Sequence, residues 1–127
     1  MVCIRLWHQS LIPKLPRQQL LGQHRECCAL RGLGWGKKHS VVNYVFDYPL
    51  DKLEDYHYLV MQEMERRGYS VTEQWWLRGY RGKRIEYKPL SLHFIHPVKH
   101  LVYVEHNDTY LKECIDNLRG KGIAIDV

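Results

Sequence analysis

The stretch that decides the fold, Leu20-Leu21-Gly22-Gln23-His24-Arg25-Glu26, forms the middle of the first helix that the sequence predicts. Around it, one set of side chains recurs at three- and four-residue spacing: Leu20, Leu21, His24, Cys27, Cys28 and Arg31. This spacing places them on one face of an α-helix and leaves Gln23, Arg25 and Glu26 on other faces. Pro16 suits the first turn of a helix, and Gly32 opens a glycine-rich turn that ends it.

A second helix is predicted from Leu50 to Arg67, and its pattern is the clearest in the chain. Its apolar face consists of Leu53, Tyr56, Val60 and Met64. Acidic residues occupy the first turns and Arg66-Arg67 the last, an order that complements the helix dipole. Gly68 then ends the helix.

A last helix is predicted after Asn107 or Asp108, because either side chain can cap its amino end. Its apolar face consists of Tyr110, Leu111, Cys114, Ile115 and Leu118. Gly120 and Gly122 end it.

Together these elements predict a mainly α fold, a compact bundle of about three to four helices with long loops. The apolar run 40–46 is too short for its periodicity to distinguish helix from strand. Residues 99–104 are the best candidate for a short extended segment. No internal repeat and no domain-separating linker interrupts the chain, so we expect one domain over residues 1–127.

The composition is that of an ordinary globular protein. Hydrophobic residues make up 45% of the 127 residues and charged residues 26%, which argues against a disordered or fibrous chain. No apolar run approaches the roughly 18–20 residues that span a bilayer, and the amino end carries no secretory signal. We therefore expect a cytoplasmic protein with no membrane partner. The four cysteines lack CxxC spacing and are expected to be buried thiols.

The basic residues favour a polyanionic partner. Lysine and arginine number 19 against 14 acidic residues, which gives a formal charge of +5. Basic residues gather in Lys37-Lys38-His39 and in the segment 78–84, which follows Trp75 and Trp76. Cations for phosphates beside aromatic faces for bases are typical of a nucleic-acid surface. A solvated loop beside core tryptophans fits the second segment equally well.

Arg25 and Glu26 are the first candidates for chemistry. A carboxylate among cations can stay ionised and stabilise a cationic intermediate, or it can move protons when it is partly buried. The same pair is also common as a surface ion pair, which contributes little to stability. Spacing alone favours the surface pair.

Four histidines near the carboxyl end are candidates for metal binding: His93, His96, His100 and His106. Close histidines can bind a transition metal, but these straddle Pro97 and match no helical metal motif. Walker and Rossmann phosphate loops and a GxSxG nucleophile motif are absent from the sequence. We therefore expect no metal and no cofactor.

Several motifs resemble the pyrimidine-dimer DNA glycosylase superfamily, which contains the phage-type endonuclease V enzymes. The superfamily pattern is an apolar pair, three residues, Arg-Glu, and then a basic turn that ends in Lys-His. Here these elements are Leu20-Leu21, Arg25-Glu26 and Lys38-His39. A later helix ends in a basic pair, glycine and an aromatic, as Arg66-Arg67-Gly68-Tyr69 does here. The likeness covers residues 5–71.

Within this superfamily, the chain is most similar to a small bacterial branch. The segments shared with that branch are Arg5-Leu6-Trp7-His8, the run from Leu11 to Leu21, and Glu105-His106-Asn107. The resemblance implies a compact set of helices wrapped by loops, which agrees with the helices predicted from periodicity.

The resemblance also implies a DNA-repair glycosylase with AP-lyase activity. In the superfamily, the free α-amine at the amino end attacks the sugar of a damaged nucleotide, displaces the base through an imine, and permits strand cleavage by elimination. Glu26 would stabilise the developing positive charge and assist proton transfer, and Arg25 would hold phosphate. Aligned from Glu26 without gaps, the position of the amine falls on Arg5, where this sequence lacks the usual threonine.

The implied partner is double-stranded DNA with pyrimidine dimers or other damaged bases, bound by a monomer. The candidate nucleic-acid contacts are Arg25, Arg31, Lys37, Lys38, His39, Arg81 and Arg84. Two hypotheses stay open: a repair glycosylase that uses Glu26, and a non-catalytic nucleic-acid-binding or interaction domain that retains the scaffold.

Overall fold

Helices form most of the chain that the structure describes. The computed structural model describes residues 6–32, 47–48, 50–77, 80 and 101–125. In chain order these residues form the 3-10 helix η1 (Gln9–Lys14), α1 (Arg17–Arg31), α2 (Leu50–Arg66), the 3-10 helix η3 (Glu73–Trp76) and α3 (Asp108–Gly120).

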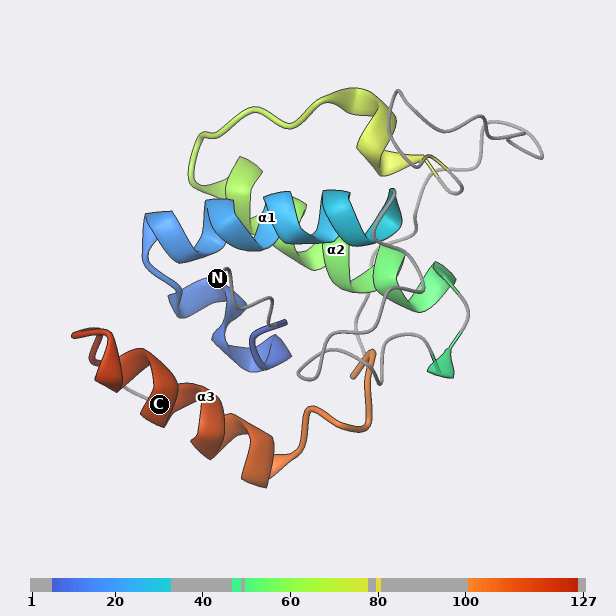
Figure 1. The fold of residues 1–127 in the computed structure, drawn as a ribbon. Coiled ribbons are helices and arrows are strands. Elements are labelled where there is room, and N and C mark those ends of the chain that lie inside the picture. Colours follow the sequence, from blue (N-terminus) through green and yellow to red (C-terminus); the bar gives the residue numbers. More distant parts are fainter. Residues whose placement is uncertain (1–5, 33–46, 49, 78–79, 81–100, 126–127) are drawn as a thin grey trace.

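The helices α1 and α2 lie side by side and run in opposite directions (Figure 1). They contribute to one core, in which the buried apolar residues of the pair are Leu20, Cys27, Leu30, Leu53, Tyr56, Val60 and Met64. Each fully buried leucine among them contributes about 1.5–3 kcal/mol to stability. Both predicted helices are thus confirmed, although Gln23, expected on a polar face, is only 1% exposed.

The carboxyl ends of α2 and α3 close in the same way. Gly68 follows α2 with a φ of 93°, and Gly122 follows α3 with a φ of 82°. In each case the amide after the glycine donates to the carbonyl five residues before it, over 2.9 Å. This is a Schellman closure, and the left-handed backbone explains why glycine occupies both positions.

At its other end, α3 is capped by Asn107. The Oδ1 atom of Asn107 accepts a hydrogen bond from the Tyr110 amide over 2.9 Å, which satisfies one of the free amides of the first turn. The hydroxyl of Tyr110 donates to the carbonyl oxygen of Leu6. The start of α3 is therefore attached to the amino-terminal segment.

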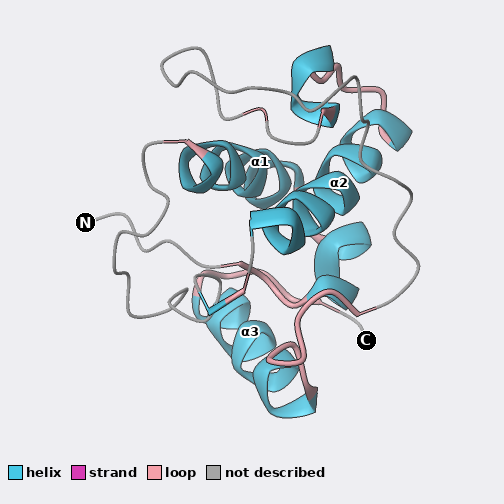
Figure 2. Cartoon of the chain, turned by 90° about the vertical axis from the view of Figure 1, so that its right-hand side faces the viewer, coloured by secondary structure: helices cyan, strands magenta, loops and turns pink. Residues whose placement is uncertain are grey.

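The amino-terminal segment with η1 lies between the α1–α2 pair and α3 (Figure 1). Seen from the side, α3 is separated from that pair by loop segments (Figure 2). The core residues of these outer parts are Leu6, Trp7, Leu11, Ile12, Leu15, Val102, Tyr103, Cys114 and Leu118. The amino-terminal segment therefore bridges α3 to the helix pair.

Residues 101–104, the described part of the segment expected to be extended, form no strand. The Val102 amide donates to Gln9 Oε1 over 2.8 Å, and the Val102 carbonyl accepts from Lys52 Nζ over 3.0 Å. Side chains thus satisfy this backbone in place of a neighbouring strand. Val102 and Tyr103 are both buried, which breaks the alternation of a half-buried strand.

The mainly helical fold predicted from the sequence is confirmed over the described residues. The ambiguous run 40–46 lies outside them. Among the described helices, none combines the length and apolar character that crossing a membrane requires.

Candidate functional site

Glu26 lines a small pocket formed by one face of α1, the amino-terminal segment and the end of α3. Its volume is about 200 Å³, and its walls are Trp7, Gln19, Gly22, Gln23, Glu26, Asn117 and Lys121. The Glu26 side chain is half-buried. A carboxylate placed in this way faces both protein and solvent, so it can exchange protons with a bound ligand.

Gln23 fixes the wall against which Glu26 lies. Its Oε1 atom accepts hydrogen bonds from the Trp7 amide over 2.7 Å and from the Tyr56 hydroxyl over 2.9 Å. Because these donors occupy the oxygen, the amide nitrogen faces the other way and donates to Glu26 Oε2 over 3.1 Å. The orientation of the Glu26 carboxylate is therefore set relative to Trp7.

Arg25, the neighbour of Glu26 in the chain, is not among the residues that line the pocket. Its side chain is exposed, and its Nη2 atom would lie 3.7 Å from a Cβ atom added to Gly22. The guanidinium therefore lies near Gly22, and its charge also helps to lower the pKa of His24. Of the two predicted residues, Glu26 lines the pocket and Arg25 does not.

The wall contributed by α3 contains Asn117 and Lys121, which the sequence analysis did not single out. Lys121 is the residue that follows α3, and its Nζ atom lies 5.5 Å from the centroid of the Trp7 ring. Its position before the helix-closing Gly122 was the available signal, because cations favour helix carboxyl ends. Nothing in the local pattern showed that this end of α3 meets α1.

Arg31, expected to contact nucleic acid, lies in the interior instead, with 0% of its surface exposed. Its guanidinium donates over 2.8–3.0 Å to three carbonyl oxygens, those of Trp75, Leu77 and Tyr80. It also pairs with Glu54 at 3.6 Å and lies 3.0 Å from His57 Nδ1. A guanidinium without exposed surface cannot reach a phosphate, so the expectation for Arg31 is corrected: it joins α1 to α2 and to η3.

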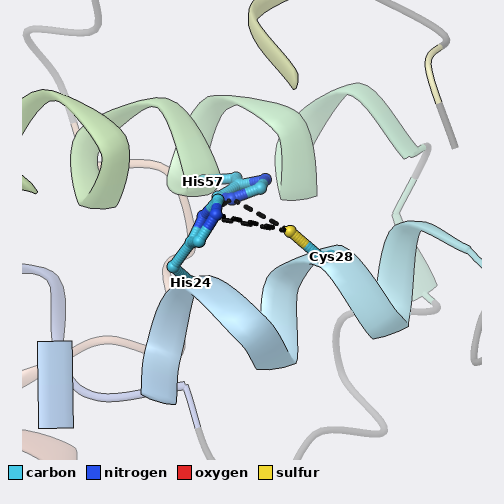
Figure 3. A group of neighbouring side chains, drawn as sticks. All are labelled: His24, Cys28 and His57. Atoms are coloured by element: carbon cyan, nitrogen blue, oxygen red, sulfur yellow. Dashed lines mark hydrogen bonds between the residues drawn. The ribbon is translucent and has the colours of Figure 1, made fainter. Parts of the chain in front are cut away.

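Three side chains that commonly bind metals meet between α1 and α2: His24, Cys28 and His57 (Figure 3). His24 Nδ1 lies 2.7 Å from His57 Nε2, and Cys28 Sγ lies 3.8–3.9 Å from the ring nitrogens. From their spacing, His24 and Cys28 were expected in the apolar stripe of the helix. The missed signal was their four-residue spacing, which aligns two ligands on one helix face.

Burial keeps this cluster uncharged at neutral pH. It lowers the pKa of His57 well below the usual value, and the nearby Arg31 and His24 lower it further. It also lowers the pKa of His24, an effect to which Arg31 and Arg25 add. Burial raises the pKa of the Cys28 thiol to about 12.

Of the histidines considered as metal ligands, His106 is described and is 2% exposed. Its Nδ1 atom accepts from the Gln9 amide over 3.0 Å, and its ring stacks on that of His8 at a centroid distance of 5.5 Å. Burial, and then the neighbouring His8, lower the pKa of His106 to about 3. His106 is therefore a neutral packing residue that holds the amino-terminal segment.

Several predicted site residues fall outside the described residues: Arg5, Lys37, Lys38, His39, Arg81, Arg84, His93, His96 and His100. Their expected roles stay predictions. Trp75, expected either on a nucleic-acid surface or beside the core, packs against Tyr80 at a centroid distance of 4.8 Å and beneath Arg31 at 5.1 Å.

A larger cavity, of about 570 Å³, lies between η1 and α2. Its walls are His8, Gln9, Ser10, Ile12, Pro13, Leu59, Gln62, Glu63, Arg66 and Leu101. Glu63, its buried acidic residue, receives hydrogen bonds from Arg66 and Arg67. Because this carboxylate is already engaged by two guanidinium groups, we regard the smaller pocket, with Glu26, as the candidate site.

The chain was compared with known protein families. Residues 4–77 match the family model described as pyrimidine dimer DNA glycosylase. The matched region includes α1 with Arg25 and Glu26, whereas α3 lies beyond it. Curated proteins and solved structures gave no match. Because the match covers more than half of the chain, the protein belongs to the pyrimidine dimer DNA glycosylase family.

Proposed function

We propose that this protein is a DNA glycosylase with AP-lyase activity, which acts on pyrimidine dimers or other damaged bases through an amino-terminal amine and Glu26. Family membership supports a role of the DNA glycosylase type. The observation that carries the finer proposal is the half-buried Glu26 carboxylate, held by Gln23 in a pocket that Trp7 also lines.

In the proposed reaction, the unprotonated α-amine attacks C1′ of the damaged nucleotide. The bond from C1′ to the base breaks, and the base leaves with the electron pair and takes up a proton. The nitrogen loses a proton as the sugar ring opens, so that an imine joins protein and DNA. Removal of a C2′ proton then expels the 3′ phosphate and cuts the strand. An α-amine suits the first step because its pKa near 8 leaves part of it unprotonated at neutral pH.

The pocket offers a group for each charge that develops. The Glu26 carboxylate would stabilise the positive charge of the protonated imine and accept the proton removed from the sugar. Two exposed cations, Lys121 at the pocket and Arg25 beside Glu26 in the chain, would hold the flanking phosphates. An amine at the position of Arg5 would be two residues from Trp7, a span of about 7 Å of extended chain.

Borohydride trapping on duplex DNA with an abasic site tests this proposal, because reduction of the imine leaves a permanent protein–DNA adduct. We expect an adduct at the amino-terminal peptide, identified by mass spectrometry. A protein with its authentic amino end that gives no adduct would contradict the proposal.

The variant Glu26→Gln separates chemistry from binding. It should lower the cleavage rate by about 10²–10⁴-fold, since it removes the proton-transferring group, while DNA affinity stays within a fewfold of the parent. Glu65→Gln is the matched control, because Glu65 is an exposed carboxylate on α2. Equal rates in both variants would rule out the role of Glu26.

The alternative function is a non-catalytic nucleic-acid-binding domain that retains the scaffold. The surplus of basic residues supports it, as does the exposed Lys121 at the pocket. It predicts binding that weakens steeply with salt, without any trapped adduct.

A further inference from the structure

We propose that His24, Cys28 and His57 form a binding site for a first-row transition metal ion, for which Zn²⁺ is the best match. The site lies between α1 and α2 and is independent of the chemistry proposed for Glu26. It replaces the expectation from the sequence that the chain binds no metal.

The placement of the three side chains comes from two adjacent helices. His24 and Cys28 are four residues apart on α1, so both project from the same face (Figure 3). His57 reaches them from the facing side of α2. One donor atom from each lies within 4.8 Å of the others.

The distances need only small changes to bind a metal. Around a tetrahedral zinc ion, a sulfur and a nitrogen ligand lie about 3.6 Å apart and two nitrogen ligands about 3.3 Å apart. The separations from Cys28 Sγ to the ring nitrogens are 3.8–3.9 Å, and that from His24 Nδ1 to His57 Nε2 is 2.7 Å. The imidazoles must therefore separate by about 0.6 Å, while the thiol moves slightly inward.

The donor set and its burial indicate which metals fit. Two imidazoles and one thiolate suit borderline-soft ions such as zinc, whereas calcium and magnesium prefer oxygen ligands. His57 is fully buried, but His24 and Cys28 are partly exposed. A metal can thus enter from the solvent side, where a water molecule would complete four ligands.

Metal binding must displace the hydrogen bond between Arg31 and His57. Arginine can only donate, so its Nη1 atom, 3.0 Å from His57 Nδ1, places the ring proton on Nε2, which then donates to His24. Metal binding moves that proton to Nδ1 and removes the Cys28 proton to solvent, so one proton is released per ion. Arg31 can leave Nδ1 because it keeps three carbonyl acceptors. After this shift His57 Nδ1 carries a proton and needs a hydrogen-bond acceptor. We expect this acceptor to be Glu54, which lies one turn before His57 on α2 and pairs with Arg31.

The consequence for the fold is a link between the two main helices. A metal bound by residues of α1 and α2 would stabilise the native state, because the unfolded chain does not hold these ligands together. The link lies on the face of α1 opposite to Glu26, about 200° away by helical periodicity.

Cobalt substitution tests the site on the full-length protein without a histidine tag. Co²⁺ added to metal-free protein should bind one ion per chain and give the near-ultraviolet absorption band of a cobalt–thiolate bond. Bound Zn²⁺ should also protect Cys28 from alkylation, as mapped by peptide mass spectrometry, and should raise the unfolding temperature. Absence of the thiolate band in the wild-type protein would overturn the proposal.

Variants locate the ligands. Cys28→Ser and His24→Gln should each weaken Co²⁺ binding by more than the roughly 10- to 100-fold typical of losing a residue that only supports a ligand. Cys27→Ala is the matched control, because this neighbouring thiol is buried in the core and should leave the band unchanged. Undiminished binding in Cys28→Ser and His24→Gln would place the metal elsewhere in the chain and contradict the proposal.

Discussion

Polar side chains on the two sides of α1 lie in different environments. On one side, Gln23 orients the half-buried carboxylate of Glu26 at the wall of a pocket. On the other side, His24 and Cys28 face α2 in an environment that keeps them neutral. One helix can thus present a carboxylate at a pocket while its opposite side packs against α2.

The largest difference in stability is expected when a buried and an exposed arginine of α1 are each replaced. Arg31→Met removes a buried guanidinium from three carbonyl oxygens and from Glu54, so the free energy of unfolding should fall by about 3–5 kcal/mol in urea titrations. Arg25→Met, the same change on the exposed side, should alter it by less than about 0.5 kcal/mol. Similar losses in the two variants would break the comparison.

Acid should destabilise the interior around His106. The pKa of His106 is about 3 in the folded chain against 6.5 unfolded, so below pH 6.5 the unfolded state binds a proton that the folded state excludes. This contribution is complete above pH 6.5 and is lost as the pH falls, by about 2 kcal/mol at pH 5. Denaturant titrations from pH 4.5 to 7.5 measure the slope.

The control for this acid effect is His106→Asn. Asparagine can still accept the hydrogen bond from the Gln9 amide, but it does not titrate. The variant should therefore show a flatter dependence of stability on pH. An unchanged slope would mean that other groups cause the acid sensitivity.

A smaller effect on stability is expected at Tyr56, a buried residue next to Gln23. Tyr56→Phe removes the hydroxyl that lies within hydrogen-bond distance of both the Trp7 carbonyl oxygen and Gln23 Oε1, and should lower the free energy of unfolding by about 1 kcal/mol. It should also lower the cleavage rate, because Gln23 orients Glu26. Tyr58→Phe on the same helix is the control, and an equal loss of activity in both would argue against this route.

The smallest effect on stability is expected at the pocket edge. Lys121→Gln removes an exposed cation, so the free energy of unfolding should change by less than about 0.5 kcal/mol. The slope of DNA affinity against salt concentration should fall by about one phosphate contact. An unchanged slope in filter-binding or fluorescence titrations would exclude Lys121 from the DNA interface.

Local sequence determined much of this fold. The three- and four-residue spacing in α1 and α2 identified helices that the structure confirms, since one face of each had to be buried. Gly68 and Gly122 marked helix ends because a left-handed residue is needed there. The conformation of residues 101–104 was harder to predict. Side chains of Gln9 and Lys52, which are distant in the sequence, form the hydrogen bonds to the backbone of this segment.

The residues of the candidate site also differ in whether local sequence could identify them. Arg25 and Glu26 could be selected from the sequence because the motif that contains them is contiguous. Asn117 and Lys121 could not, because they reach the pocket only through the packing of α3. His57 was missed for the same reason, since its partners are on α1.

The sequence by itself determined where the helices begin and end and which family the chain resembles, because those signals lie within a few consecutive turns. Only the tertiary structure decided whether each polar side chain is buried or exposed. Arg31 and Arg25 are the same residue type on one helix, yet Arg31 is 0% exposed and Arg25 is exposed to solvent. The physical reason is that burial depends on what packs against a residue, and those neighbours are distant in the chain.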